Sequence, residues 1–129
     1  MTIFISEYDN NPQILVIKVN GLLKRNEWLE YLEYFKHIYV NHCKEGKIYI
    51  IWDLTDGDIV PLTWMHEKAK LLDEMTEETK KHLIASSAII SSSMIRQIFN
   101  MFLGIYTNSR PLRITKDYEQ ALEFFNSVK

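Results

Sequence analysis

The stretch Ile48-Tyr49-Ile50-Ile51-Trp52-Asp53-Leu54-Thr55-Asp56-Gly57-Asp58 decides the fold. Its first half is almost continuously apolar, which is typical of a strand covered on both faces. Its second half is acidic and contains glycine, a composition that favours a turn. A buried strand that ends in a polar turn is the element expected in the middle of a parallel sheet flanked by helices.

Strand-like and helical patterns alternate on either side of this stretch. The predicted strands are residues 3–5, 14–19, 48–52, 83–90 and 111–115. The predicted helices are residues 28–43, a segment after Pro61, residues 94–106 and the segment after Asp117, with a shorter turn at 76–81. The first two strands are joined by a short polar link and should form an antiparallel hairpin. This order predicts one α/β domain over residues 1–129, with a mixed, mostly parallel sheet of about five strands and four to five flanking helices.

Polar residues at the expected helix starts suggest specific caps. Asn26 is a plausible cap for the first helix, and one of the serines at 91–93 for the helix that follows them. Asp117 and Gln120 have the spacing of a capping box at the last helix.

Composition narrows the class of protein. The 129 residues are 47% hydrophobic and 25% charged, as in an ordinary globular domain. A net charge of −2 provides no basic field for nucleic acid or an anionic membrane. No apolar run approaches the roughly 20 residues of a membrane span, and the N-terminus lacks the features of a signal peptide. The single cysteine, Cys43, cannot form an internal disulfide, so we expect a cytoplasmic protein.

No residue pattern indicates catalysis, a metal or a cofactor. Asp53, Asp56 and Asp58 could ligate a hard cation, but a calcium loop needs further ligands and a closing glutamate. We therefore interpret these acids as turn formers. Serines 91–93 could cradle a phosphate, although capping alone explains them. Cys43 and the scattered histidines lack ligand spacing, and a nucleophile elbow is absent, so we expect no enzymatic activity.

Three segments resemble the sulfate-transporter and anti-sigma-factor-antagonist (STAS) domain, in particular the SpoIIAA-like family. Trp52-Asp53-Leu54-Thr55 is similar to the Asp-Leu-Ser that follows the family's central strand. The strand at 83–90 with its following helix, and residues 110–122, are similar to the family's later elements. The resemblance implies a STAS fold and a non-enzymatic regulatory or protein-interaction module. Its relation to the lipid-binding SEC14 fold implies an alternative, the binding of a small apolar ligand such as a lipid.

The switch region of the family is altered in this chain. Anti-sigma-factor antagonists carry a phosphorylatable serine in an Asp-Ser-Ser-Gly turn, whereas residues 61–64 read Pro-Leu-Thr-Trp here. Thr63 is the remaining hydroxyl, and the matching acid and glycine are missing. We therefore expect a degenerate switch region, comprising Asp53, Thr55, Asp58 and Thr63, that is not regulated by phosphorylation.

The predicted helix at 94–106 is unusually apolar. Nine of its 13 residues are hydrophobic, more than one buried stripe requires. Either the same chain covers the surplus, or the helix presents a face to a second subunit, a protein partner or a ligand. The interface residues expected in the second case, which would make a homodimer, are Met94, Ile98, Phe99, Met101, Phe102, Ile105 and Tyr106.

Overall fold

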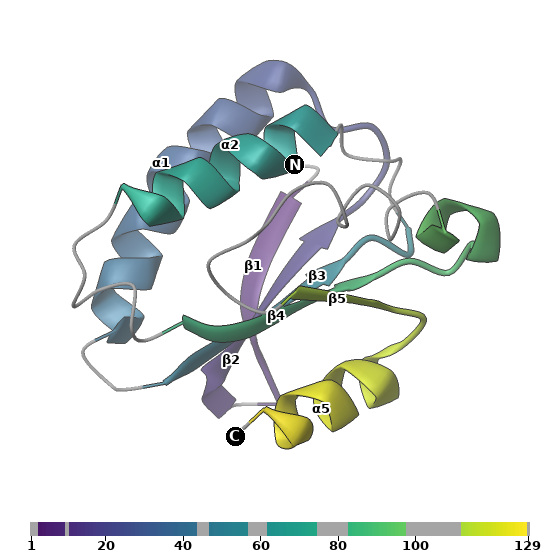
Figure 1. Cartoon of the computed structure of the whole chain (residues 1–129). Coiled ribbons are helices and arrows are strands. Elements are labelled where there is room, and N and C mark those ends of the chain that lie inside the picture. The colour runs from purple at the N-terminus through teal and green to yellow at the C-terminus, as the bar shows by residue number, and fades with distance from the viewer. Residues whose placement is uncertain are drawn as a thin grey trace.

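The computed structural model describes residues 3–9, 11–43, 47–56, 62–74, 83–97 and 112–128. These residues form a five-stranded sheet with helices on both faces (Figure 1). The strands are β1 (Ile3–Tyr8), β2 (Asn11–Val19), β3 (Ile48–Asp53), β4 (Leu83–Ile89) and β5 (Leu112–Thr115). The helices are α1 (Arg25–Cys43), α2 (Leu62–Asp73) and α5 (Tyr118–Ser127), and residues 93–97 are also helical.

Strand order in the sheet follows the order of the chain, β1-β2-β3-β4-β5. β1 is antiparallel to β2, and the other three pairs are parallel. Right-handed crossovers that always step in the same direction place their helices on the same face. α1 and α2 accordingly cover one face of the sheet, and α5 covers the other (Figure 1). The predicted mixed, mostly parallel sheet is confirmed. Some predicted helical segments, including 76–81, lie outside the described residues.

The central strand β3 contributes to two separate cores. Every residue of β3 is buried, as its apolar run predicts. Ile48, Ile50 and Trp52 face α1 and α2, whereas Tyr49 and Ile51 face α5. The first core also contains Trp28, Tyr31 and Phe35 of α1, and the second contains Ala121, Phe124 and Phe125 of α5.

Two predicted caps are present and one is wrong. Asp117 caps α5 by accepting a hydrogen bond from the Gln120 amide at 2.9 Å. The Ser92 hydroxyl accepts from the Ile95 amide at 3.4 Å. Asn26 is not a cap, because α1 begins at Arg25. The Glu27 carboxylate instead accepts a hydrogen bond from the Lys24 amide at 3.2 Å, which starts the helix earlier than predicted.

The first hairpin also differs from the prediction. The link expected between the strands at 3–5 and 14–19 would include Asn11 and Pro12, but β2 already begins at Asn11. Asp9 has a φ of 47°, a left-handed conformation that aspartate tolerates, so the chain reverses earlier. Pro12 is accommodated near the start of β2, before the residues that pair with β3.

Candidate functional site at the ends of the parallel strands

The carboxyl ends of the parallel strands lie along one edge of the sheet, the edge where open α/β sheets bind their ligands. Asn20 and Gly21 follow β2, residues 54–56 follow β3, residues 90–92 follow β4, and Lys116 and Asp117 follow β5. We call this region the strand-end surface. Of the predicted switch region, Thr55 belongs to this surface and Asp53 directly precedes it at the end of β3, and the helical segment 93–97 follows residues 90–92 in the chain.

Asp53 is a buried acceptor at the end of β3. Its residue exposure is 3%, and one oxygen accepts hydrogen bonds from the Thr55 hydroxyl at 2.6 Å and the Thr55 amide at 3.1 Å. Its other oxygen accepts from the Tyr118 hydroxyl at 2.6 Å. Burial raises the pKa of Asp53, but these hydrogen bonds lower it more, so the pKa lies below its usual value. Asp53 accepts from the amide two residues on, as a turn-forming aspartate does, but it is buried as the last residue of β3, one residue beyond the predicted strand.

The loop after β3 is anchored to both neighbouring strands. The Leu54 amide donates to the Ile89 carbonyl at 3.1 Å, and the Gly21 amide donates to the Asp56 carbonyl at 3.1 Å. The Lys18 ammonium pairs with the Asp56 carboxylate at 3.2 Å. Within the described ranges, no three metal-ligating side chains are grouped to hold a metal ion. Asp58, the third acid of the predicted turn, lies outside these ranges.

The Arg96 side chain binds the backbone at the end of β4. Arg96 Nη1 donates to the carbonyl oxygens of Ile90 at 2.7 Å and Ser91 at 2.8 Å. The Ser92 hydroxyl acts as a cap in the same segment. The Ser92 hydroxyl and the Arg96 guanidinium therefore both have intramolecular partners. This arrangement explains Ser92 by local structure and supports its role as a cap over that in a phosphate cradle.

Several exposed side chains surround these anchored groups. Thr55 is exposed beside Asp53, and Thr63 is exposed in the first turn of α2. Met94 is 67% exposed at the start of the helical segment 93–97, and Leu22 is 65% exposed before α1. Of the predicted interface residues, the structure describes Met94; Ile98, Phe99, Met101, Phe102, Ile105 and Tyr106 lie outside the described residues.

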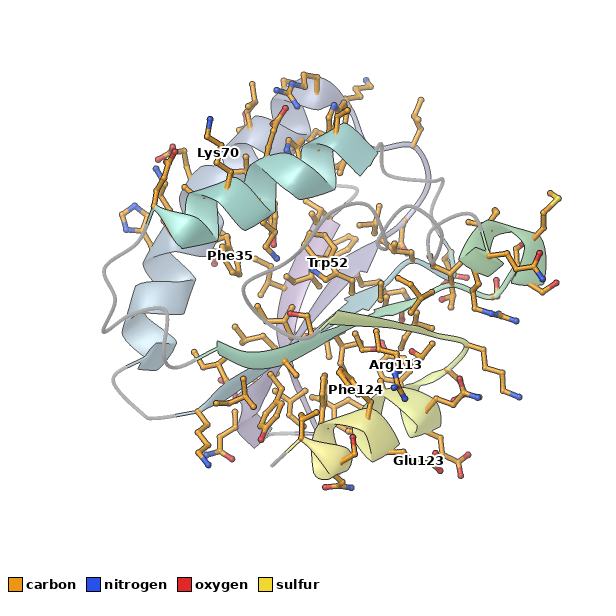
Figure 2. The ribbon with its side chains drawn as sticks, viewed as in Figure 1. Phe35, Trp52, Lys70, Arg113, Glu123 and Phe124 are labelled. Atoms are coloured by element: carbon orange, nitrogen blue, oxygen red, sulfur yellow. The ribbon has the colours of Figure 1, made fainter. Side chains whose placement is uncertain are left out.

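A buried lysine lies on the face of the sheet that α1 and α2 cover. The sequence alone did not single it out as a site residue. Lys68 of α2 is 5% exposed. Its Nζ lies 3.9 Å from the ring centroid of Trp52, 4.1 Å from that of Phe35 and 5.5 Å from that of Tyr31. Phe35 and Trp52 lie between the helices and the sheet, whereas Lys70, two residues further along α2, points outward (Figure 2). The inward position of Lys68 could be read from its helical spacing after Trp64.

A hollow of about 330 Å³ lies at the β5 edge of the sheet, between β5 and α5. Its walls include Arg113, whose guanidinium lies 4.9 Å from the ring centroid of Phe124, and Glu123 (Figure 2). Beneath it, the hydroxyls of Ser87 and Thr115 form a buried 2.9 Å hydrogen bond. The polar rim makes this hollow a poor match for the small apolar ligand of the alternative function.

Comparisons with known proteins show a SpoIIAA-like fold. A DUF3478-family protein from Shewanella loihica, described as having a SpoIIAA-like fold, matches with a TM-score of 0.64 and 16% identity over 95% of this chain and 90% of that one. An anti-sigma factor antagonist from Mycobacterium paratuberculosis matches with a TM-score of 0.57 and 11% identity over 98% of this chain and 92% of that one. No family model and no curated protein matches the sequence. Among the described residues, no helix is both long and apolar enough to span a membrane.

Proposed function

We propose that this chain is a non-enzymatic regulatory module of the STAS type that binds a protein partner through its strand-end surface. The observation that carries this proposal is the burial and hydrogen bonding of the Asp53 carboxylate. Its carboxylate is buried and engaged by Thr55 and Tyr118, so it serves as a structural acceptor rather than as an accessible acid or ligand. The fold shared with an anti-sigma factor antagonist supports a regulatory role. The proposal includes a cytoplasmic location, which the single cysteine supports.

The proposed module works without the usual phosphorylation switch. Thr63 is exposed, but its neighbours are Leu62 and Trp64 instead of small polar residues. The half-buried Trp64 packs against the α1–α2 core and carries the Arg25 guanidinium at 5.2 Å from its ring centroid. Arg25 is in turn paired with Glu67 at 2.8 Å. The nearby arginine is thus already engaged, which disfavours its rearrangement around a phosphate.

Self-association is part of the same proposal. Met94 presents a large exposed apolar side chain at the beginning of the predicted helix 94–106, in which nine of 13 residues are hydrophobic. An interface that includes Met94 would extend the strand-end surface, and a two-fold symmetric dimer is the commonest arrangement for such a contact.

Site-specific photo-crosslinking in the native cells tests the partner proposal. A photoreactive phenylalanine analogue replaces Met94, and the matched control carries it at Tyr34, which is 59% exposed on α1. We expect position 94 to cross-link one protein other than this chain, identified by mass spectrometry, in addition to a second copy of the chain itself, and position 34 to cross-link neither. The Thr63→Glu change should leave its yield unaltered. Equal labelling from both positions, or loss of labelling with Thr63→Glu, contradicts the proposal.

The binding of a small apolar ligand is the alternative function. It is favoured by the aromatic cluster around Lys68, which combines buried ring faces with polar atoms between α1, α2 and the sheet.

A further inference from the structure

Three buried polar groups meet in the core beneath α1 and α2. We call them, with the surrounding rings, the Lys68 cluster; its members are Trp28, Tyr31, Phe35, Trp52, Trp64 and Lys68. The indole nitrogen of Trp28 and the hydroxyl of Tyr31 are buried without a hydrogen-bond partner. Among the described residues, Lys68 contacts the faces of aromatic rings, and no carboxylate pairs with it.

Such an arrangement is unfavourable as a purely structural core. Lysine is almost never fully buried without a paired acid, and an unpaired buried hydroxyl or N–H also destabilises the folded state. The ring faces of Trp52 and Phe35 offset part of this cost through cation–π attraction. Desolvation still dominates: burial lowers the pKa of Lys68 well below its ordinary value and raises the pKa of Tyr31.

The three groups share one chemical property, since each can donate a hydrogen bond. The Tyr31 hydroxyl and the Trp28 N–H lack an acceptor, Lys68 pairs with no carboxylate among the described residues, and the walls around them are aromatic. Arg25, whose guanidinium lies over the Trp64 ring, already pairs with Glu67 at 2.8 Å. A complementary ligand therefore supplies oxygen acceptors on an apolar body.

We propose that the Lys68 cluster binds a small organic acid with an apolar chain, whose carboxylate is received by Lys68, Tyr31 and Trp28. The carboxylate accepts hydrogen bonds from all three groups, and the chain packs against the aromatic rings. A neighbouring carboxylate stabilises the ammonium form of Lys68 and so opposes the lowering of its pKa by burial. This inference deepens the alternative function, by naming the ligand class, and is independent of the proposed protein partner.

Titration of the whole chain with octanoate tests the proposal. All three tryptophans of the sequence belong to the cluster, so intrinsic fluorescence reports on this site alone. We expect a saturable fluorescence change with a Kd below about 1 mM. Octanol, which has the same chain without the charge, and formate, which has the charge without the chain, should bind much more weakly.

Variants separate the carboxylate site from general apolar binding. Lys68→Met keeps the length of the side chain and should weaken octanoate binding on the order of thirtyfold, and Tyr31→Phe about tenfold. Lys70→Met, on the exposed side of the same helix, should change nothing. Circular dichroism confirms that each variant is folded. The proposal is overturned if wild type does not bind octanoate, if octanol or formate binds equally well, or if folded Lys68→Met retains full affinity. These outcomes leave the crosslinking result untouched.

Discussion

The Tyr118 hydroxyl donates a 2.6 Å hydrogen bond to the Asp53 carboxylate across 65 residues of sequence. This bond fastens the first turn of α5 to the end of the central strand. The Tyr118 ring also stacks on Tyr8, with ring centroids 5.5 Å apart, so one side chain connects α5 to both β1 and β3. The geometry of the strand-end surface therefore depends on the docking of the last helix.

Removing the Tyr118 hydroxyl should destabilise the fold. We expect Tyr118→Phe to lower the free energy of unfolding by about 1–3 kcal/mol, because the buried Asp53 carboxylate loses one of its donors. Denaturant unfolding measures this loss. Ser127→Ala, which removes a hydroxyl that donates to the Phe124 carbonyl elsewhere on α5, is the control and should have a smaller effect. Equal losses in both variants would argue against a special role for the Asp53–Tyr118 bond.

Acid should weaken the hydrogen-bonded arrangement around the Asp53 carboxylate. The folded-state pKa of Asp53 is lowered, so its carboxylate contributes stability above its unfolded pKa, and this contribution is lost as pH falls through the folded value. We therefore expect the unfolding free energy of wild type to fall below about pH 4. The Asp53→Asn variant should be less stable at pH 7 and should show a shallower decline in acid. Thermal melts from pH 2 to pH 7 compare the two slopes.

Replacing Lys68 by methionine should stabilise the protein without its ligand. An apolar side chain of similar length removes the unpaired buried amine, and we expect a gain of about 1–3 kcal/mol at pH 7. The folded-state pKa of Lys68 is lowered, so the unfolded chain binds more protons and wild-type stability rises with pH towards the unfolded value of 10.5. Lys68→Met should lack this rise in chemical denaturation curves at pH 7 and pH 9. A variant less stable than wild type contradicts this account.

Substitutions at Thr63 should have little effect. α2 begins at Leu62, so Thr63 is already helical and does not occupy the cap position. Because Thr63 is also exposed, we expect Thr63→Ala to change stability by less than about 0.5 kcal/mol. Thr63→Glu should leave partner binding intact. Stoichiometric phosphorylation of Thr63 in protein from native cells, or abolition of binding by Thr63→Glu, would restore the antagonist-type switch.

A charge at Met94 should prevent self-association. The side chain is 67% exposed, so Met94→Asp should remain folded while its carboxylate is disfavoured in an apolar interface. Sedimentation velocity over a range of concentrations should show a dimer for wild type and a monomer for the variant. Leu29→Asp, at a 47% exposed position on α1, is the control and should remain dimeric. Wild type that stays monomeric at high concentration rules out the dimer.

Sequence patterns predicted the features that depend on local chemistry. The unbroken apolar run of β3, the Asp117 cap and the serine cap after β4 all follow from residues close together in the chain. The burial of Asp53 was missed because one of its donors, Tyr118, is distant in sequence. Without that partner, an acid beside Thr55 and Asp56 resembles an exposed turn residue.

Lys68 could not be recognised from hydropathy alone. A lysine at the border of an apolar helical stripe normally extends its ammonium to solvent. Its burial here depends on Phe35 and Trp52, which come from two other elements. Phe124 of α5 was likewise not singled out, and its burial involves the Arg113 guanidinium of another element, β5.

The strands lie in the sheet in the same order as in the chain, and this order has a consequence for folding. Each strand after β1 pairs with the strand made immediately before it, so no strand has to insert between two that are already joined. The sheet can therefore assemble during synthesis by addition at a single growing edge, starting from the β1–β2 hairpin. Every closure spans one crossover, which keeps the entropy lost at each step small. The docking of α5 against β3 through Tyr118 would then complete the process as its last long-range event.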